Sequence, residues 1–431
     1  MTEDRRFFNM FPGLTEEKAI EILATPLEQL DDSSERYIAA SHLINFPTER
    51  SINALITTVQ DLDPAMDHRI ARRKAVESLG RLKAQTALPT IRSCLTDPDQ
   101  YTVENAVWAI GEIGTDDDQI KAEITNLLQQ ENQSYRVIIQ TLANFDYKPA
   151  IAAIEPLTTA EDKLTASTAI TAICRLTNDY SGMNQIVEFL QHEQVKIRRA
   201  AMQDLADAQY YEAIAAIAKC PISLAFRVRA LRLLAQAGLP TQKIAFSDIE
   251  PYLDDVILDH PKTLDLLHEY DQLPSLDFVI NELYQTDFGR CYLATQTMIE
   301  HYAGVAGPAL MLTYEKSAHN DYGAHYHVIK LWGWLKYEPA RELIIRALHN
   351  TEPQFQKSRG AAAIALAQLG GSEVVSLLKE QLNSSVFGLK YACLLALNQL
   401  GYQEFESSCF EGQEPLLQQK LERLSSSSKK N

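Results

Sequence analysis

The sequence lacks the patterns that usually identify nucleotide, metal and hydrolytic chemistry. It contains no phosphate-binding loop, no dinucleotide fingerprint, no GxSxG and no HExxH. Its six cysteines include no CxxC pair, so neither a zinc site nor a disulfide framework is indicated. Three cysteines fall inside apolar helical patterns, and we expect them to be small core residues: Cys94, Cys174 and Cys393.

Glycine, proline and positive charge are also scarce. Gly and Pro number 17 each in 431 residues, which is low for an all-β chain. The net charge of −17 would repel phosphate backbones, so nucleic acid is not expected as a partner. No apolar run approaches the roughly 18 residues that span a bilayer, and MTEDRRFFNMF lacks the apolar core of a signal peptide. We therefore expect no membrane insertion and a cytoplasmic location.

The sequence does have an internal repeat with a spacing of 29 to 34 residues. Small residues recur at this spacing in the middle of apolar helical stretches: Ala75, Ala106, Ile138, Ala169, Ala201, Ala230, Ala362 and Cys393. Weaker candidates for further such anchors are Ala39, Ala294 and Val328, and about three anchors are expected between Ala230 and Ala362. An arginine precedes the small residue by three positions in four repeats: Arg72, Arg198, Arg227 and Arg359.

This pattern predicts an all-α, HEAT-like α-solenoid, a right-handed superhelix of antiparallel helix pairs with the second helices lining the working surface. We expect an N-terminal helical cap over residues 1–34, the repeat solenoid over residues 35–402, and a C-terminal segment over residues 403–431. The terminal SSSSKKN is of low complexity and is expected to be disordered. A doubly wound sheet anywhere in residues 60–240 would contradict this prediction.

The first departure from a plain repeat lies in YTVENAVWAIGEIG, residues 101–114. Tyr101, Asn105, Trp108 and Glu112 follow one another at helical spacing on a face other than the apolar stripe. A large aromatic ring flanked by an amide and a carboxylate suits a flat ligand. The alternative is that Trp108 only fills space between adjacent repeats.

The second departure is HNDYGAHYHVIKLWGW, residues 319–334, where the repeat is least regular. Asp321 and Tyr322 precede a glycine, so the carboxylate either points into a groove or caps a helix. The segment also holds three histidines, but their spacings match no common zinc pattern, and we predict no metal site. These histidines are His319, His325 and His327.

Several stretches together resemble the phycobilin lyases of the E/F class, and within it the single-chain phycoerythrin α-subunit lyases (CpeY type). The resemblance covers essentially residues 5–402, and the stretches are RYIAASHLINFPTERSINALI, RRKAVESLGRL, YTVENAVWAIGEIGT, YDQLPSL, TDFGRCYLAT and HNDYGAHYHVIKLWGWLKY. It implies an enzyme that attaches phycoerythrobilin through a thioether to a cysteine of the phycoerythrin α subunit. The bilin is a substrate and no cofactor is implied. Some relatives also isomerise the bilin to phycourobilin, and a phycoviolobilin-forming relative carries an Asn-His-Cys motif; this chain has no His-Cys pair.

A bilin offers a flat π-system, a row of pyrrole NH groups and two propionates, so it needs aromatic faces, a carboxylate and cations. Because the acceptor thiol belongs to the client protein, the lyase supplies binding and proton transfer. Asp321 is the candidate carboxylate and general acid/base, next to Tyr322, with His325 or His327 as second choice. The candidate ring faces are Tyr101, Trp108, Tyr322, Trp332 and Trp334, and the candidate cations are Arg136, Arg227 and Arg290. Arg227 is alternatively a structural arginine of the repeat.

Two other functions stay open at this point. The chain is alternatively a non-catalytic HEAT scaffold or bilin chaperone that serves another lyase, because some relatives act in pairs with a helper subunit. A zinc enzyme is a third reading. Composition does not separate these alternatives.

Overall fold

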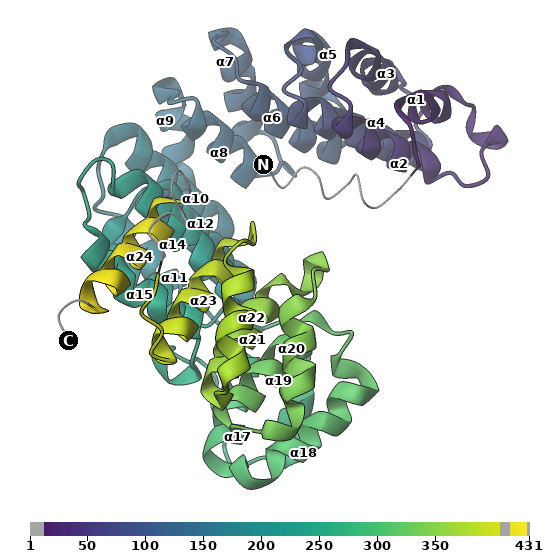
Figure 1. The fold of residues 1–431 in the computed structure, drawn as a ribbon. Coiled ribbons are helices and arrows are strands. Elements are labelled where there is room, and N and C mark those ends of the chain that lie inside the picture. Colours follow the sequence, from purple (N-terminus) through teal and green to yellow (C-terminus); the bar gives the residue numbers. More distant parts are fainter. Residues whose placement is uncertain (1–12, 406–413, 429–431) are drawn as a thin grey trace. The chain divides into compact units, whose positions relative to one another are not determined.

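A computed structural model describes residues 13–405 and 414–428 of the chain (Figure 1). Within these residues the regular elements are helices, and no strand occurs, so the predicted all-α class is confirmed. The chain divides into two compact parts, unit 1 up to Gly182 and unit 2 from Met183. The boundaries expected at residues 34 and 402 stay predictions. None of the helices in the described residues combines the length and hydropathy needed to span a membrane.

Unit 1 is a regular series of helix pairs. Its helices are α1 (Glu16–Ala24), α2 (Glu35–His42), α3 (Glu49–Gln60), α4 (Met66–Arg81), α5 (Leu88–Ser93), α6 (Gln100–Ile113), α7 (Asp118–Asn126), α8 (Tyr135–Asn144), α9 (Ile151–Ile154) and α10 (Lys163–Thr177). The even-numbered helices pack on one another in sequence order, and each also packs on its own odd-numbered partner. This neighbour-to-neighbour packing is the HEAT arrangement.

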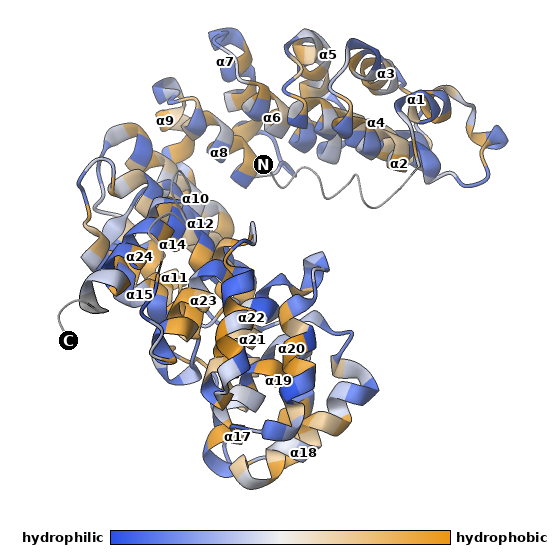
Figure 2. Cartoon of the chain, viewed as in Figure 1, coloured by the Kyte–Doolittle hydropathy of each residue, from blue (hydrophilic) through white to orange (hydrophobic). Residues whose placement is uncertain are grey.

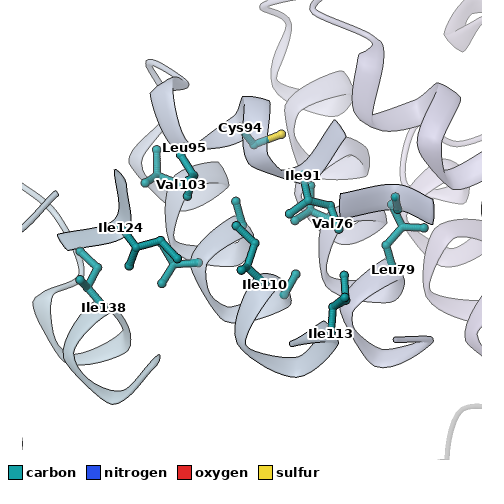
Figure 3. Close-up of a cluster of buried hydrophobic side chains, with 14 of the residues drawn as sticks. Val76, Leu79, Ile91, Cys94, Leu95, Val103, Ile110, Ile113, Ile124 and Ile138 are labelled. Atoms are coloured by element: carbon teal, nitrogen blue, oxygen red, sulfur yellow. The ribbon is translucent and has the colours of Figure 1, made fainter. Parts of the chain in front are cut away.

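The core of unit 1 lies between these two rows of helices. Figure 3 shows its aliphatic side chains pointing toward one another, among them Val76 of α4, Ile91 of α5 and Ile110 of α6. Helices such as α5 and α7 carry both hydrophobic and hydrophilic residues (Figure 2), as expected of helices with one buried face. Since no pair has a complete core of its own, each is stabilised by its neighbours.

The repeat arginine ties successive pairs together. Arg36 donates to the carbonyl of Leu23, which lies 13 residues earlier, and to Asp61, 25 residues later. Arg72 repeats both spacings, because it donates to Val59 O at 2.7 Å and pairs with Asp97. The arginine therefore satisfies a carbonyl at the end of one first helix and an acidic side chain at the end of the next.

Unit 2 begins with the same pattern. Its helices are α11 (Met183–Phe189), α12 (Val195–Asp207), α13 (Ile214–Lys219), α14 (Leu224–Gly238), α15 (Phe246–Leu258), α16 (Leu276–Glu282), α17 (Phe288–His301), α18 (Ala303–Thr313), α19 (Tyr322–Trp334), α20 (Arg341–His349), α21 (Gln356–Leu369), α22 (Ser372–Gln381), α23 (Phe387–Gln399) and α24 (Pro415–Ser428). A π-helical turn, Tyr314–Ala318, lies between α18 and α19.

All the predicted anchors lie in second helices of pairs and are buried, the weaker candidates included. One of the three positions expected between Ala230 and Ala362 has no second helix. There, α15 ends at Leu258, its C-cap Asp259 has a left-handed conformation, and Pro261 follows. A non-helical stretch over residues 264–275 takes the place of the missing helix.

Helix α24 corrects the expected disordered tail, because Ser425–Ser428 belong to it. Lys420 of α24 donates to Glu250 at 2.8 Å and to Asp254 at 2.6 Å, both on α15. Four leucines of α24 are buried: Leu416, Leu417, Leu421 and Leu424. Apolar burial and buried ion pairs thus hold the helix on α15, which composition alone did not reveal. The last three residues lie outside the described residues.

Candidate functional site

The predicted site residues fall into two groups, one in each unit, and we describe each group by itself. In unit 1 four of them lie on α6, and Arg136 lies on α8. Tyr101 is 53% exposed, and the Arg73 guanidinium stands 4.7 Å from its ring centre. Asn105 Nδ2 donates to Arg73 O at 3.3 Å, and Glu112 is exposed. Trp108 is only partly buried, so it keeps surface with which to meet a ligand.

Cation–aromatic pairs continue across three helices of unit 1. Lys74 of α4 stands 4.9 Å from the ring of Tyr37 on α2, and Arg81 of α4 stands 5.6 Å from the ring of Trp108 on α6. Glu77 lies between these two cations and pairs with both. Burial opposes ionisation of Glu77, but hydrogen bonds from Lys74 and Arg81 outweigh it and lower its pKa. We call Tyr37, Tyr101 and Trp108 the aromatic face of unit 1. Glu77 partly neutralises the cations Lys74 and Arg81 beside these rings.

Two of the three arginines predicted to bind the bilin propionates, Arg136 and Arg290, already have partners within the protein. Arg136 donates to Thr168 and weakly, at 3.5 Å, to Leu164 O. Arg290 makes a two-pronged ion pair with Glu282, at 2.8 and 3.1 Å, and this pairing raises the pKa of Arg290. A ligand carboxylate at Arg290 has to compete with that pair.

Arg227 is the structural arginine of its repeat, which corrects its expected role as a propionate ligand. Its side chain is fully buried and donates to Ala218 O and Ile222 O, each at 3.1 Å, and it pairs with Asp259. The Asp259 carboxylate also accepts hydrogen bonds from Tyr292 and Tyr326. With no exposed surface and every group engaged, this arginine stabilises the fold.

Lys330 completes this buried network. Its ammonium donates to Leu258 O and lies 3.8 Å from Asp259, so one carboxylate serves two buried cations. Burial lowers the pKa of Lys330 to about 8, although Asp259 opposes the shift. The sequence analysis missed both residues, because Asp259 stands where a repeat helix is absent and a single lysine in an apolar helix carries no motif.

Burial likewise corrects three roles expected within α19. Trp332 is fully buried and donates to Gly307 O at 3.4 Å, so its ring is a packing group. Burial lowers the pKa of His325 to about 4 and that of His327 to about 3. Neutral, enclosed imidazoles of such low basicity do not suit proton transfer at neutral pH. Trp334 is partly buried and contacts the ring of His260 at 5.0 Å.

The three histidines do not form a common site. His319 is exposed and donates to Tyr314 O at 2.8 Å, while His325 is joined to Ser358 Oγ at 2.9 Å and His327 faces the rings of Phe288, Tyr292 and Tyr326. Among the residues with a described position, no group of three or more histidines, cysteines or carboxylates is placed to hold a metal ion.

The cysteines of the described residues are buried free thiols, as predicted for Cys94, Cys174 and Cys393. Burial raises the pKa of Cys174 to about 11 and that of Cys393 to about 12. These thiols therefore stay protonated at neutral pH. Cys409 lies outside the described residues.

Asp321 and Tyr322 meet at the start of α19. Asp321 is the N-cap, and its Oδ1 accepts hydrogen bonds from Gly323 N at 2.9 Å and Ala324 N at 2.7 Å. Its Oδ2 accepts no hydrogen bond from any residue that the structure describes. Tyr322 is 47% exposed and stacks on Phe288 at 6.4 Å between ring centres. The cap thus fixes a carboxylate whose second oxygen remains available beside an open ring.

A lysine that the sequence analysis did not single out lies next to this pair. The Lys357 ammonium stands over Phe288, Tyr322 and Tyr326, at 4.1, 4.5 and 5.1 Å from the ring centres. We call these three rings and Lys357 the Lys357 cage. Its only sequence signal is a lysine two residues before a repeat arginine, Arg359, which is not distinctive by itself.

The helix pairs and buried repeat arginines define an α-helical repeat protein of the HEAT class. Two protein-family models match the chain: HEAT repeats over residues 65–143 and PBS lyase HEAT-like repeat over residues 358–384. The complex of CpcE and CpcF of phycocyanin lyase from Nostoc sp. is a solved neighbour at 24% identity and a TM-score of 0.47, over 60% of this chain and 96% of that one.

Two curated relatives extend over nearly the whole chain. Phycocyanin operon protein Y of Pseudanabaena tenuis is 56% identical over 92% of this chain and 94% of its own length. Bilin biosynthesis protein CpeY of Synechococcus sp. is 32% identical over 87% of this chain and 91% of its own length. The chain therefore belongs to the HEAT-repeat phycobilin lyases, the enzyme family that its sequence resembles.

Proposed function

We propose that this protein attaches phycoerythrobilin through a thioether to a cysteine of the phycoerythrin α subunit. The resemblance to the phycoerythrin α-subunit lyases supports the choice of bilin and acceptor, and 32% identity to bilin biosynthesis protein CpeY supports a role in bilin chemistry. The observation that carries the proposal within the site is Asp321, whose Oδ1 is fixed by the helix start while Oδ2 is left without a hydrogen bond from the described residues.

In this reaction the acceptor thiol adds to the ethylidene group of the bilin A ring. The thiol loses a proton, a C–S bond forms and the bilin gains a proton, so no oxidant or reductant is required. Asp321 Oδ2 accepts hydrogen bonds from the pyrrole NH row and favours the protonated, reactive bilin. Tyr322 supplies an open ring for the π-system, and the buried thiols of the lyase do not compete for the bilin.

The test is to co-express the chain with the phycoerythrin α subunit and a supply of phycoerythrobilin, without any second lyase. A covalent adduct on the denatured α subunit, with the absorbance of bound phycoerythrobilin, is expected. Asp321→Asn retains a capping side chain but removes the charge. The loss of a charge-assisted hydrogen bond, about 1.5–3 kcal/mol, lowers the transfer rate by roughly ten- to a hundredfold.

The other outcomes identify the alternatives. An adduct with phycourobilin absorbance identifies a lyase-isomerase. An adduct that forms only when a partner lyase is added identifies a helper or chaperone. If Asp321→Asn and Asp321→Ala both transfer bilin at the parent rate once folded, Asp321 is only a cap.

A further inference from the structure

The Lys357 cage holds a cation without a counter-ion. Three aromatic ring faces surround the ammonium, but no residue in the described ranges accepts a hydrogen bond from it or pairs with it. An ammonium has three N–H donors, and ring faces attract the charge without accepting all three. Burial lowers the pKa of Lys357 to about 7, because the opposing effects of Cys291, Asp259 and Asp321 are smaller.

The helix that carries Lys357 adds to this imbalance. Lys357 is the second residue of α21, where the positive end of the helix dipole disfavours a cation. The side chain is nonetheless partly buried under rings from α17 and α19 instead of extending into solvent. The helix therefore disfavours a charged lysine at this position, and the rings attract its charge but leave its N–H donors without acceptors among the described residues.

The same position in another repeat shows that the fold does not require this arrangement. Lys196 is the second residue of α12 and, like Lys357, stands two residues before the repeat arginine. Its side chain is exposed and has no aromatic cage. The two lysines therefore differ because of the rings around Lys357. These rings belong to α17 and to α19, the helix that Asp321 caps.

A ligand has access to the cage through Tyr322. This ring is 47% exposed, stacks on Phe288 at an interplanar angle of 24°, and forms one wall of the cage. The Lys357 ammonium stands 4.5 Å from the centre of the same ring, so Tyr322 links the exposed surface to the cation. Next to the cage, His327 contacts the rings of Phe288 and Tyr326, and its Nε2 is a buried nitrogen without a hydrogen-bond partner among the described residues.

We propose that Lys357 binds a carboxylate of a conjugated ligand whose π-system lies on Tyr322, and that this carboxylate is a propionate of the bilin. This inference rests on the proposed function for the identity of the ligand. It assigns the propionate to Lys357 in place of the cations predicted from the sequence, which were Arg136, Arg227 and Arg290. Lys357 is a binding residue in this proposal, and Asp321 keeps the NH row.

The experiment measures binding alone, by absorbance titration of the full-length chain without any acceptor subunit. The two probes are free phycoerythrobilin and its dimethyl ester, in which both propionates are neutral. The parent is expected to bind the free acid at least tenfold more tightly than the ester. Lys357→Met abolishes this preference and leaves ester affinity unchanged, because only the charged contact is lost.

Two further variants control for structure and for charge. Lys357→Arg keeps a cation that pairs with carboxylates and stacks on rings, so it retains most of the preference for the acid. Lys196→Met removes a lysine from the matched position of α12 and keeps the parent preference in full. Melting temperatures of all variants show whether the cage still folds.

Three results overturn the inference: an unchanged acid preference in Lys357→Met, equal losses of acid and ester binding, or no binding of either probe by the parent. Failure of the proposed function is distinguishable. If the parent binds the acid through Lys357 but forms no thioether on the acceptor, the binding site stands and the lyase assignment fails. If Lys357→Met forms the adduct at the parent rate and binds free phycoerythrobilin with the parent affinity, the inference about Lys357 fails and the proposed function stands.

Discussion

Units 1 and 2 use the same repeat arginine in different ways. In unit 1, Arg36 and Arg72 connect a carbonyl 13 residues back with an acid 25 residues ahead, so each bond stays between neighbouring pairs. In unit 2, Arg198 pairs with Asp287, 89 residues away, and Arg227 joins a network with Asp259. Arg359 of unit 2 keeps the local pattern, because it donates to Leu348 O and to Gln381 Oε1. The repeat arginine therefore aligns neighbours in both units, but in unit 2 Arg198 also connects distant repeats.

This difference shows where a repeat protein acquires a site. Unit 1 remains regular, and its aromatic face is a row of similar cation–aromatic pairs. Unit 2 loses one second helix, and the rings, buried charges and Lys357 cage gather around α17, α19 and α21. Regular stacking repeats one environment, whereas the irregular unit brings together side chains that no single repeat contains.

The largest expected effect separates the two networks. Asp259→Asn leaves Arg227 and Lys330 as two buried cations without their carboxylate, so it should lower the free energy of unfolding of unit 2 by about 3–5 kcal/mol. Asp61→Asn in unit 1, whose side chain is partly exposed beside Arg36 and His68, should cost about 1 kcal/mol.

Urea unfolding measures both variants. In a Trp108→Phe background the remaining tryptophans, Trp332 and Trp334, report unit 2 by fluorescence, and far-UV circular dichroism reports the whole chain. Equal losses for Asp259→Asn and Asp61→Asn would remove the distinction between a local and a shared arginine.

Acidification should act next most strongly, and on unit 2. The folded pKa values of His325 and His327, about 4 and about 3, lie below the ordinary value of 6.5, so the folded state keeps these rings neutral. Their contribution is fully present above pH 6.5 and is lost as the pH falls, because the unfolded chain then binds more protons. Between pH 6.5 and 5 the loss is about 2–4 kcal/mol for the pair.

The fluorescence of the same Trp108→Phe background follows this loss in urea titrations at the two pH values. A variant that carries both His325→Gln and His327→Gln should show a much smaller change between them. The prediction is wrong if the double variant and its parent lose the same stability.

A matched pair of caps tests what is special about Asp321. Asp162 caps α10 in unit 1 as Asp321 caps α19, so either residue changed to Ala should lower stability by about 1 kcal/mol. Only Asp321→Ala should also slow bilin transfer in the folded fraction, and Asp321→Asn should slow it without the loss of stability. Thermal melts measure the stability of each Asp162 and Asp321 variant, and transfer assays on the same preparations measure its rate of bilin transfer.

The smallest effect concerns the aromatic face of unit 1. Trp108→Leu and Tyr101→Leu each remove a ring that is partly exposed. If this face contacts the bilin, the loss of a ring–ligand contact worth about 0.5–1 kcal/mol should lower bilin affinity about two- to fivefold for each. Leu62→Ala, at another exposed apolar residue of unit 1, serves as the control. Affinities equal to that of the control would restrict binding to unit 2.

The sequence predicted the repeat architecture because its signal is local. A small residue every 29 to 34 positions marks the closest approach of two helices, so even the weak candidates Ala294 and Val328 lie in second helices and are buried. The prediction that Cys94, Cys174 and Cys393 are core residues was correct for the same reason, because it used only their apolar neighbours in the sequence. Periodicity reports what a residue does within its own repeat.

The site was only partly predictable, because its contacts join residues far apart in the sequence. Asp321 and Tyr322 were recognised from their position before a glycine, although the capping role was only an alternative. Lys357 and Asp259 were missed, since Lys357 meets Phe288 across 69 residues and Asp259 meets Tyr326 across 67. Trp332, His325 and His327 were chosen from their residue types, and the structure shows them to be buried.

The docking of α24 on α15 has a consequence for how the chain folds. Unit 1 can fold pair by pair as each pair is synthesised, because its contacts are short in sequence. Unit 2 cannot finish in that way: the contact between Lys420 and Glu250 closes a loop of 170 residues, and it forms only after the last helix has been made. Truncation before Pro415 should therefore expose the part of α15 that α24 covers and slow or prevent the completion of unit 2, while unit 1 folds at its usual rate.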